Sequence, residues 1–191
     1  MAECNRLTGG LLYSNERRIS LESKPLLFHD IDGVLFGHYG NCYQLRPGVR
    51  EWLHWAHEHF EVIWLTAWEK HRIEALLDLL YIREHLPILV ANCLNYENKV
   101  VWIEEAVPKL HGRNWFWVDD EIDNKFAPYI QAAGISPDHC IQCNPKGEDE
   151  LVSAQRTLAS RIMSSAGSMT RLGTDAGTAL PAEASFVREK P

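Results

Sequence analysis

The chain has 191 residues, of which 46% are apolar and 24% are charged, a composition typical of globular proteins rather than disordered or fibrous ones. Its 19 basic and 26 acidic residues give a net charge of −7, which disfavours a protein working by non-specific attraction to nucleic acid or anionic membranes. No apolar run approaches the roughly 20 residues needed to cross a bilayer, and the first 24 residues lack a signal-peptide pattern. With an odd number of cysteines and no disulfide framework, the sequence predicts a cytoplasmic protein without a membrane partner.

Composition divides the chain into three parts. Residues 1–24 are polar and weakly patterned, and we interpret them as a flexible leader. Residues 164–191 are rich in Ser, Gly, Ala, Thr and Pro and hold a single aromatic residue, too little apolar surface to offset the entropy of ordering. The sequence therefore predicts one folded domain over residues 25–163, followed by a disordered tail.

Short apolar runs alternate with helical patterns through this domain. In chain order, the expected elements are strand 26–31, helix 49–60, strand 62–65, helix 73–80, strand 88–91, helix 99–107, strand 115–118, helix 125–133, strand 140–143 and helix 151–162. Pro47–Gly48 is a start signal for the first helix, and Gly134 is typical of a helix C-terminus. Such alternation indicates an α/β protein with a three-layer Rossmann-like fold, about five parallel strands and helices on both faces.

Acidic residues and a hydroxyl follow three of the predicted strands. Asp30 and Asp32 come after the first strand, Thr66 ends the second, and Asp119 and Asp120 follow the fourth. The carboxyl ends of parallel strands meet at one edge of the sheet, so these groups are expected to converge there. Clustered carboxylates repel one another unless a cation lies among them, and hard oxygen ligands suit Mg²⁺. Turn preferences of Asp and Gly explain any one of these positions, but explain all three together poorly.

Four motifs over residues 25–163 resemble those of the haloacid dehalogenase-like superfamily, most of whose members are Mg²⁺-dependent phosphatases. They read LLFHDIDGVL, VIWLT, ENKVVWIEE and WFWVDDEID, in the order that this superfamily uses. The stretches LRPGVREWL and WLTAWE look closest to the capless domains grouped with the Swiss Army Knife RNA-repair proteins.

The resemblance implies a role for each matching residue. Asp30 would be the nucleophile that forms an aspartyl-phosphate, and Asp32 the acid and base for the leaving group and the water. Lys99 would compensate negative charge, although Lys70 and Lys109 remain alternatives. The implied substrate-binding residues are Gly33, Thr66, Ala67 and Trp68. The implied Mg²⁺ ligands are Asp30, the backbone carbonyl of Asp32, Asp119 and Asp120, with the division between the last two left open.

Other candidate features have simpler explanations. Asp123 is interpreted as a helix-start acid. Cys140 and Cys143 form a lone C-x-x-C on a predicted strand and are interpreted as buried structural cysteines. Trp68 could either pack in the core or stack on a base at the pocket mouth.

The spacing of the motifs limits what can cover the site. About 33 residues separate Asp32 from Thr66, and the predicted helix uses much of that stretch, so there is no room for a large cap. The segment 36–46 is long enough for a small hairpin flap. Capless members of the superfamily tend to accept bulky phosphorylated substrates, which suggests RNA or DNA ends. However, residues 25–163 carry 12 Lys and Arg against 20 acids, and no basic strip follows the chain.

The sequence thus predicts a Mg²⁺-dependent phosphomonoesterase with a phosphorylated substrate, and the preferred setting is the processing of nucleic-acid ends in RNA repair. The alternatives are a small-metabolite or nucleotide phosphatase, and a non-catalytic phosphate-binding module. Nothing in the sequence indicates an obligate protein partner.

Overall fold

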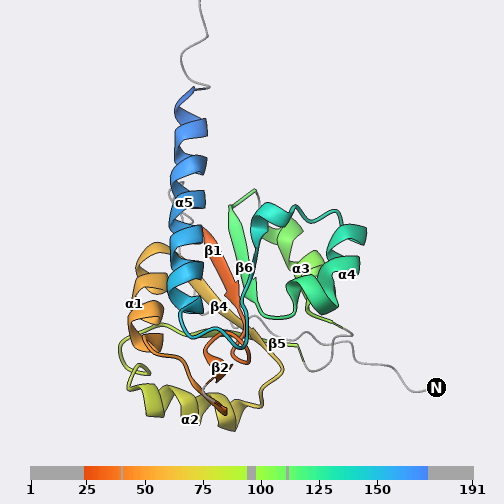
Figure 1. Cartoon of the computed structure of the whole chain (residues 1–191). Helices are drawn as coiled ribbons and strands as arrows, with labels where there is room; N and C mark the ends of the chain where they lie inside the picture. Colours follow the sequence, from red (N-terminus) through yellow and green to blue (C-terminus); the bar gives the residue numbers. More distant parts are fainter. Residues whose placement is uncertain (1–23, 40, 94–97, 111, 172–191) are drawn as a thin grey trace, which may run out of the picture. The chain divides into compact units, whose positions relative to one another are not determined.

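A computed structural model describes residues 24–39, 41–93, 98–110 and 112–171 (Figure 1). The chain divides into two compact units, with the boundary after Leu158 inside the last helix. The first unit contains the sheet and all the residues discussed as a site. Within the second unit, the described part is the helical segment 159–171.

A five-stranded parallel sheet forms the centre of the first unit. Its order is β5 (Leu89–Asn92), β4 (Glu61–Thr66), β1 (Leu26–His29), β6 (Trp115–Asp119) and β7 (Cys140–Gln142). Each strand coincides with a predicted one. Every residue of the central strand β1 and of β6 is buried, as expected for apolar runs covered by helices on both faces.

Successive side chains of β1 pack on opposite faces of the sheet. Phe28 of β1 belongs to a core with Trp102 of α3 (Lys99–Ala106), near α4 (Ala127–Ala132). On the opposite face, His29 lies against Trp52 of α1 (Val49–His59). In Figure 1, α3 and α4 lie on one side of the sheet and α1 on the other, so the predicted three-layer α/β arrangement is confirmed.

The remaining helices are α2 (Lys70–Leu80), which lies between β4 and β5 in sequence, and α5 (Glu150–Arg171), which runs eight residues beyond the domain boundary predicted at 163. Short turns η1 (Val107–Leu110), η2 (Ile122–Phe126) and η3 (Pro137–His139) complete the elements. The predicted leader 1–24, except for its last residue, and positions 172–191 of the predicted tail lie outside the described residues. Among the helices that the structure describes, none is both long and apolar enough to span a membrane.

The helix predicted over 125–133 begins differently. Residues 122–126 form a π-helical turn in which Lys125 and Phe126 both donate backbone hydrogen bonds to the carbonyl of Glu121. Pro128 stands in the first turn of α4, where its missing N–H is tolerated. At the other end Gly134 adopts a positive φ of 65° and its N–H donates to Gln131, as expected for a helix terminus.

A small antiparallel hairpin, β2 (Phe36–Tyr39) and β3 (Cys42–Leu45), follows β1, and the described residues contain no large cap. Arg46, directly after the hairpin, is 3% exposed and donates hydrogen bonds to the carbonyls of Gly33, Val34 and Asn144. One planar guanidinium thus joins the loop after β1 to the loop after β7. This arrangement fixes the base of the hairpin beside the carboxyl edge of the sheet.

Candidate active site

The carboxyl ends of β1, β4 and β6 bring the predicted residues together. The backbone N–H of Asp30 donates to the carbonyl of Val118 on β6, and the carbonyl of Thr66 accepts from Cys93 beyond β5. The carbonyl of Asp119 accepts from Cys143 beyond β7. The sheet hydrogen bonding therefore continues one residue past the strands and holds the site backbone in place.

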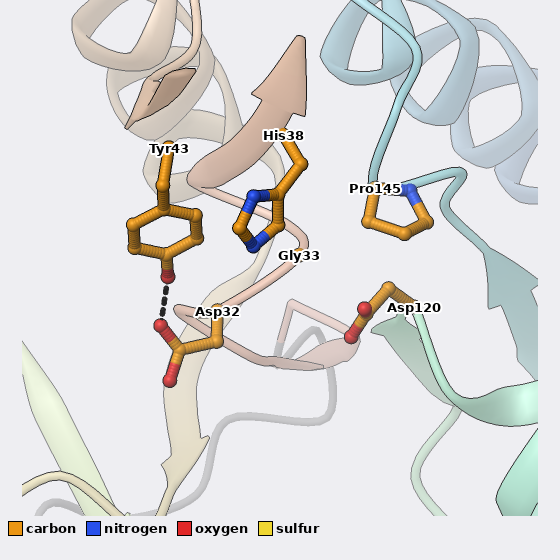
Figure 2. Close-up of a pocket in the computed structure, with 6 residues that line it drawn as sticks. All are labelled: Asp32, Gly33, His38, Tyr43, Asp120 and Pro145. Carbon is orange, nitrogen blue, oxygen red and sulfur yellow. Dashed lines mark hydrogen bonds between the residues drawn. The ribbon is translucent and has the colours of Figure 1, made fainter. Parts of the chain in front are cut away.

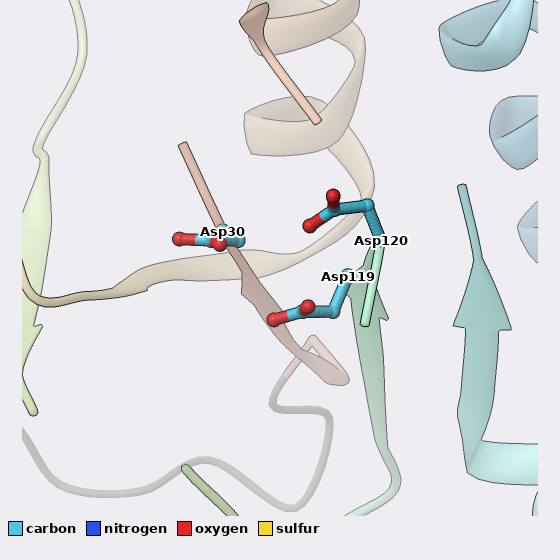
Figure 3. Close-up of side chains that lie close together, drawn as sticks. All are labelled: Asp30, Asp119 and Asp120. Carbon is cyan, nitrogen blue, oxygen red and sulfur yellow. The ribbon is translucent and has the colours of Figure 1, made fainter. Parts of the chain in front are cut away.

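Three carboxylates form a compact acidic group at this edge. Asp30, Asp119 and Asp120 each offer an oxygen, and these oxygens all lie within 4.8 Å of one another (Figure 3). Asp30 and Asp119 are buried, and Asp120 is partly exposed. A buried group of hard oxygen donors at such separations can hold a metal ion.

Lys99 is the cation already present in this group. Its Nζ lies 2.5 Å from Oδ2 of Asp30 and 2.7 Å from Oδ2 of Asp119. The lysine is the first residue of α3, and the side chain of Asn98 caps that helix by accepting from the N–H of Val101. Burial alone lowers the pKa of Lys99, but Asp119 and Asp30 together raise it above its ordinary value, so the ammonium stays charged.

One lysine does not neutralise three carboxylates. Burial raises the pKa of Asp30 to about 7, although the charge of Lys99 lowers it and the charge of Asp119 raises it to a smaller extent. Burial, followed by the charges of Asp119 and Glu121, raises the pKa of Asp120 to about 6. Both carboxyls would therefore gain from an additional cation, and the donor set fits a divalent metal ion.

These raised pKa values predict that cation binding depends on pH. A metal ion requires both carboxylates ionised, so protons compete with it below pH 7 at Asp30 and below pH 6 at Asp120. For a divalent cation at this site, with Mg²⁺ as the probe, we expect the affinity to fall by about tenfold per pH unit between pH 7 and 6, and more steeply below. Calorimetric titrations at pH 8, 7, 6 and 5.5 measure this, and an affinity independent of pH would contradict it.

Gly33 allows the loop after β1 to pass closely by Asp120. Its φ is +69°, and a Cβ added there would overlap Cγ and both carboxylate oxygens of Asp120. Glycine is the residue that meets both demands, since it adopts positive φ without strain and adds no side-chain volume. The backbone of Asp120 is held from another side, because Gln142 Nε2 donates to its carbonyl at 2.6 Å.

Asp32 lies apart from the acidic group. Its exposed carboxylate accepts a hydrogen bond from Trp68 Nε1 at 2.6 Å through Oδ2, and another from the hydroxyl of Tyr43 through Oδ1. In Figure 2 the Asp32 carboxylate points toward Tyr43 of the hairpin and away from Asp120. The side chain of Asp32 is therefore not among the three that gather as potential metal ligands, and the role of its backbone carbonyl stays a prediction.

Two pockets open at this edge of the sheet. One, of about 420 Å³, is lined by residues that include Asp30, Thr66, Ala67, Lys99 and Asp120. The other, of about 440 Å³, is lined by Asp32, Gly33, His38, Tyr43, Asp120 and Pro145 (Figure 2). Both pockets share Asp32 and Asp120, so the acidic group and the hairpin border one continuous region of the surface.

Thr66 and Trp68 have specific local roles. Thr66 is 1% exposed and its Oγ1 accepts from the backbone N–H of Trp68 at 3.2 Å. The Trp68 indole is buried, with Phe36 at 5.6 Å between ring centroids and the guanidinium of Arg72 at 4.0 Å over the ring. Since Arg72 already covers a face of the indole, Trp68 packs against protein groups rather than presenting an open platform for a base.

The other sequence candidates lie elsewhere. Lys70 is exposed and pairs with Glu74 at 3.7 Å, and Lys109 is exposed in η1, so neither contacts Asp30. Asp123 lies at the start of the η2 turn as predicted, and its N–H donates to Gln142 Oε1. Cys140 and Cys143 are both buried.

Three residues at the site were not identified from the sequence. They are Tyr43, which reaches Asp32, Arg72, which covers Trp68, and Arg46, which secures the loop after β1. Arg46 directly precedes the Pro–Gly helix start in the LRPGV stretch, and this position could have identified it as a candidate site residue. Tyr43 and Arg72 carried no such signal, because their roles depend on contacts across separate elements.

Comparison with known proteins adds no assignment. No protein-family model matches the chain. No curated protein sequence is significantly similar to it. The site must therefore be interpreted from its own chemistry.

Proposed function

We propose that this chain is a phosphomonoesterase of the haloacid dehalogenase-like type, which works through an aspartyl-phosphate on Asp30 with Mg²⁺. The observation that carries the proposal is the environment of Asp30. Its carboxylate lies at the carboxyl end of the central strand, 2.5 Å from Lys99 and grouped with Asp119 and Asp120. A buried carboxylate held by a lysine beside a candidate cation site is suited to attack an anionic phosphoryl group, once that group's charge is neutralised.

In the first step an oxygen of Asp30 attacks phosphorus in line with the leaving oxygen. The P–O bond to the leaving group breaks, its electron pair goes to the leaving oxygen, and protonated Asp32 supplies the proton that completes the alcohol. The N–H of Ile31 donates to Asp30 Oδ1 at 2.7 Å, which leaves Oδ2 as the oxygen beside Lys99. Thr66 and Lys99 line the same pocket and would contact the phosphoryl oxygens.

In the second step Asp32, now ionised, takes a proton from water. The resulting hydroxide adds to phosphorus, the bond between phosphorus and Asp30 breaks, and hydrogen phosphate leaves with both aspartates restored to their starting state. Asp30, Asp119 and Asp120 would hold Mg²⁺ with the carbonyl of Asp32, and the ion would supply positive charge at the phosphoryl oxygens.

The test is Mg²⁺-dependent phosphate release by the wild-type chain beside Asp30→Asn. We expect wild-type activity on 4-nitrophenyl phosphate that requires the metal and is absent in Asp30→Asn, because the amide is no nucleophile. An acid-quenched reaction should also leave phosphate on the wild-type chain in a form that neutral hydroxylamine cleaves. Activity that survives Asp30→Asn would overturn the assignment of the nucleophile.

A panel of substrates distinguishes the three candidate functions, which are nucleic-acid end processing, hydrolysis of small phosphate esters and phosphate binding without turnover. It contains RNA and DNA with 3′- or 5′-phosphate ends, nucleoside monophosphates and small sugar phosphates. A preference for phosphorylated nucleic-acid ends would support the repair setting, whereas a preference for small esters would favour a metabolite or nucleotide phosphatase. Phosphate binding with no turnover of any of these compounds would favour a binding module and contradict the proposed enzyme.

A further inference from the structure

The carboxylate of Asp32 is held by two side chains from separate elements. Trp68, in the loop after β4, donates to Oδ2. Tyr43, on strand β3 of the hairpin, donates to Oδ1 (Figure 2). The two donors are distant in sequence from the aspartate, by 36 and 11 positions. Asp32 itself is exposed, so without these bonds its side chain would be free to adopt several rotamers.

Both donors are themselves held by packing. The Tyr43 ring stacks on Phe36 with centroids 5.3 Å apart and an interplanar angle of 17°, and Phe36 in turn lies against Trp68. Arg72 covers the Trp68 ring at 4.0 Å, and Asn92 donates to the Trp68 carbonyl at 3.1 Å. A continuous aromatic row, Tyr43, Phe36 and Trp68, thus connects the hairpin to the loop after β4 and fixes both hydrogen-bond donors.

The two donors differ chemically. An indole N–H can only donate, whereas a phenol hydroxyl can donate or accept. While Trp68 donates to Oδ2, a proton on Asp32 is favoured on Oδ1, because the O–H oxygen of a carboxylic acid accepts a hydrogen bond more weakly than its carbonyl oxygen does. Oδ1 faces Tyr43, at the pocket that Tyr43, His38 and Pro145 also line, and this is where a leaving oxygen could reach the proton.

We propose that Trp68 and Tyr43 are positioning residues that orient the carboxylate of Asp32 and direct its transferable proton to Oδ1, on the side of the hairpin pocket. This inference rests on the proposed phosphatase function. Trp68 anchors Oδ2 throughout the reaction, and the Tyr43 hydroxyl donates to one lone pair of Oδ1, which keeps the carboxyl group oriented while the proton on Oδ1 is directed to the leaving oxygen. The leaving group then lies against the hairpin pocket, and the proton that Oδ1 gives to the alcohol is regained from the attacking water.

The experiment compares two substrates that differ in their need for a general acid. 4-Nitrophenolate leaves readily without a proton, whereas a primary alkoxide does not, so loss of proton delivery slows an alkyl phosphate far more than 4-nitrophenyl phosphate. We expect Trp68→Phe and Tyr43→Phe to lower kcat/KM for the alkyl ester by about 10- to 100-fold, and that for the aryl ester by less than about threefold. Asp32→Asn removes the general acid altogether, so it defines the largest change in the ratio of alkyl to aryl kcat/KM that a positioning variant can reach.

Matched controls distinguish positioning from general damage. Trp52→Phe makes the same substitution as Trp68→Phe, but at a core tryptophan whose Nε1 has no hydrogen-bond partner among the described residues. Tyr39→Phe removes a hydroxyl from the same hairpin as Tyr43, but this hydroxyl donates to the carbonyl of Leu45 and not to Asp32. Both should leave the ratio of alkyl to aryl activity unchanged. In the Asp32→Asn background, adding Trp68→Phe should change the alkyl rate by less than about twofold, because a residue acting through Asp32 has nothing left to position.

The outcomes are separable from those of the function itself. Equal losses on both substrates, or a further loss in the Asp32→Asn background, would overturn the positioning role while leaving the phosphatase intact. Absence of turnover in the wild type would overturn the phosphatase and the positioning role with it. The hydrogen bond has its own readout, since the Trp68 indole N–H resonance should shift in Asp32→Asn, and an unchanged resonance would contradict the contact.

Discussion

Replacing Gly33 with alanine is expected to weaken cation binding and to reduce the proposed phosphatase activity by about 100-fold or more. Two costs coincide at this position. A φ of +69° costs a residue with a Cβ about 1–2 kcal/mol, and the added methyl group would overlap the carboxylate of Asp120. Gly33 and the following residues Val34 and Leu35 are buried, so we expect the Asp120 side chain, rather than the loop, to move away from its place near Asp30 and Asp119.

Gly48→Ala is the matched control for this prediction. Gly48 has a φ of +76°, but the nearest atom to an added Cβ is Glu51 Oε2 at 4.0 Å. This variant therefore carries the backbone strain without the clash, and we expect a loss of about 1–2 kcal/mol in the free energy of unfolding with unchanged Mg²⁺ affinity. Urea unfolding in EDTA and calorimetric Mg²⁺ titration measure both quantities. Wild-type Mg²⁺ affinity in Gly33→Ala would contradict the close approach of the loop to Asp120.

The sequence predicted the acidic edge because parallel topology determines where strand ends meet. Once the apolar runs of β1, β4 and β6 are identified, Asp30, Thr66 and Asp119 must lie at one edge of the sheet, whatever the detailed packing. Lys99 was implied by the family resemblance, as the lysine at the start of the predicted helix before the fourth strand, and the structure puts its ammonium between Asp30 and Asp119.

The hydrogen-bond partners of Asp32 could not be predicted from the topology of the sheet. Hydrophobic periodicity tells which face of an element is buried, but it does not tell which exposed hydroxyl meets which carboxylate. Tyr43 stands on a short, largely exposed strand, and Trp68 follows a strand end where packing and ligand binding leave the same sequence pattern. The contact between Arg46 and the carbonyl of Asn144 spans 98 positions, a separation at which local patterns carry no information.

The second large effect is expected from Lys99→Met, which removes the cation from a buried acidic group. Lys99 is bonded to Asp30 and Asp119, whose side chains are 10% and 0% exposed, so its loss leaves two buried carboxyls without a counter-charge. Breaking a buried pair in this way typically costs about 3–5 kcal/mol. We therefore expect the free energy of unfolding in EDTA at pH 8 to fall by about that amount, and activity to fall by at least about 100-fold.

The destabilisation should depend on pH in a defined direction. The pKa of Asp30 is about 7 in the folded chain against 3.8 in the unfolded chain, and removal of Lys99 raises the folded value further. The folded state then binds more protons than the unfolded state at pH values between these limits, so stability falls as pH rises. Lys99→Met should consequently lose less stability at pH 5.5, where Asp30 is protonated, than at pH 8.

Lys70→Met supplies the control, because Lys70 forms an exposed pair with Glu74 and such pairs contribute about 0–1 kcal/mol. Added Mg²⁺ should stabilise Lys99→Met more than it stabilises the wild type, since the ion then neutralises carboxylates that no lysine contacts. Thermal unfolding with EDTA or Mg²⁺ at pH 5.5 and 8 measures these differences. If Lys99→Met were as stable as Lys70→Met under all four conditions, the acidic group would carry little unbalanced charge, and the physical reason for a cation at this edge of the sheet would disappear.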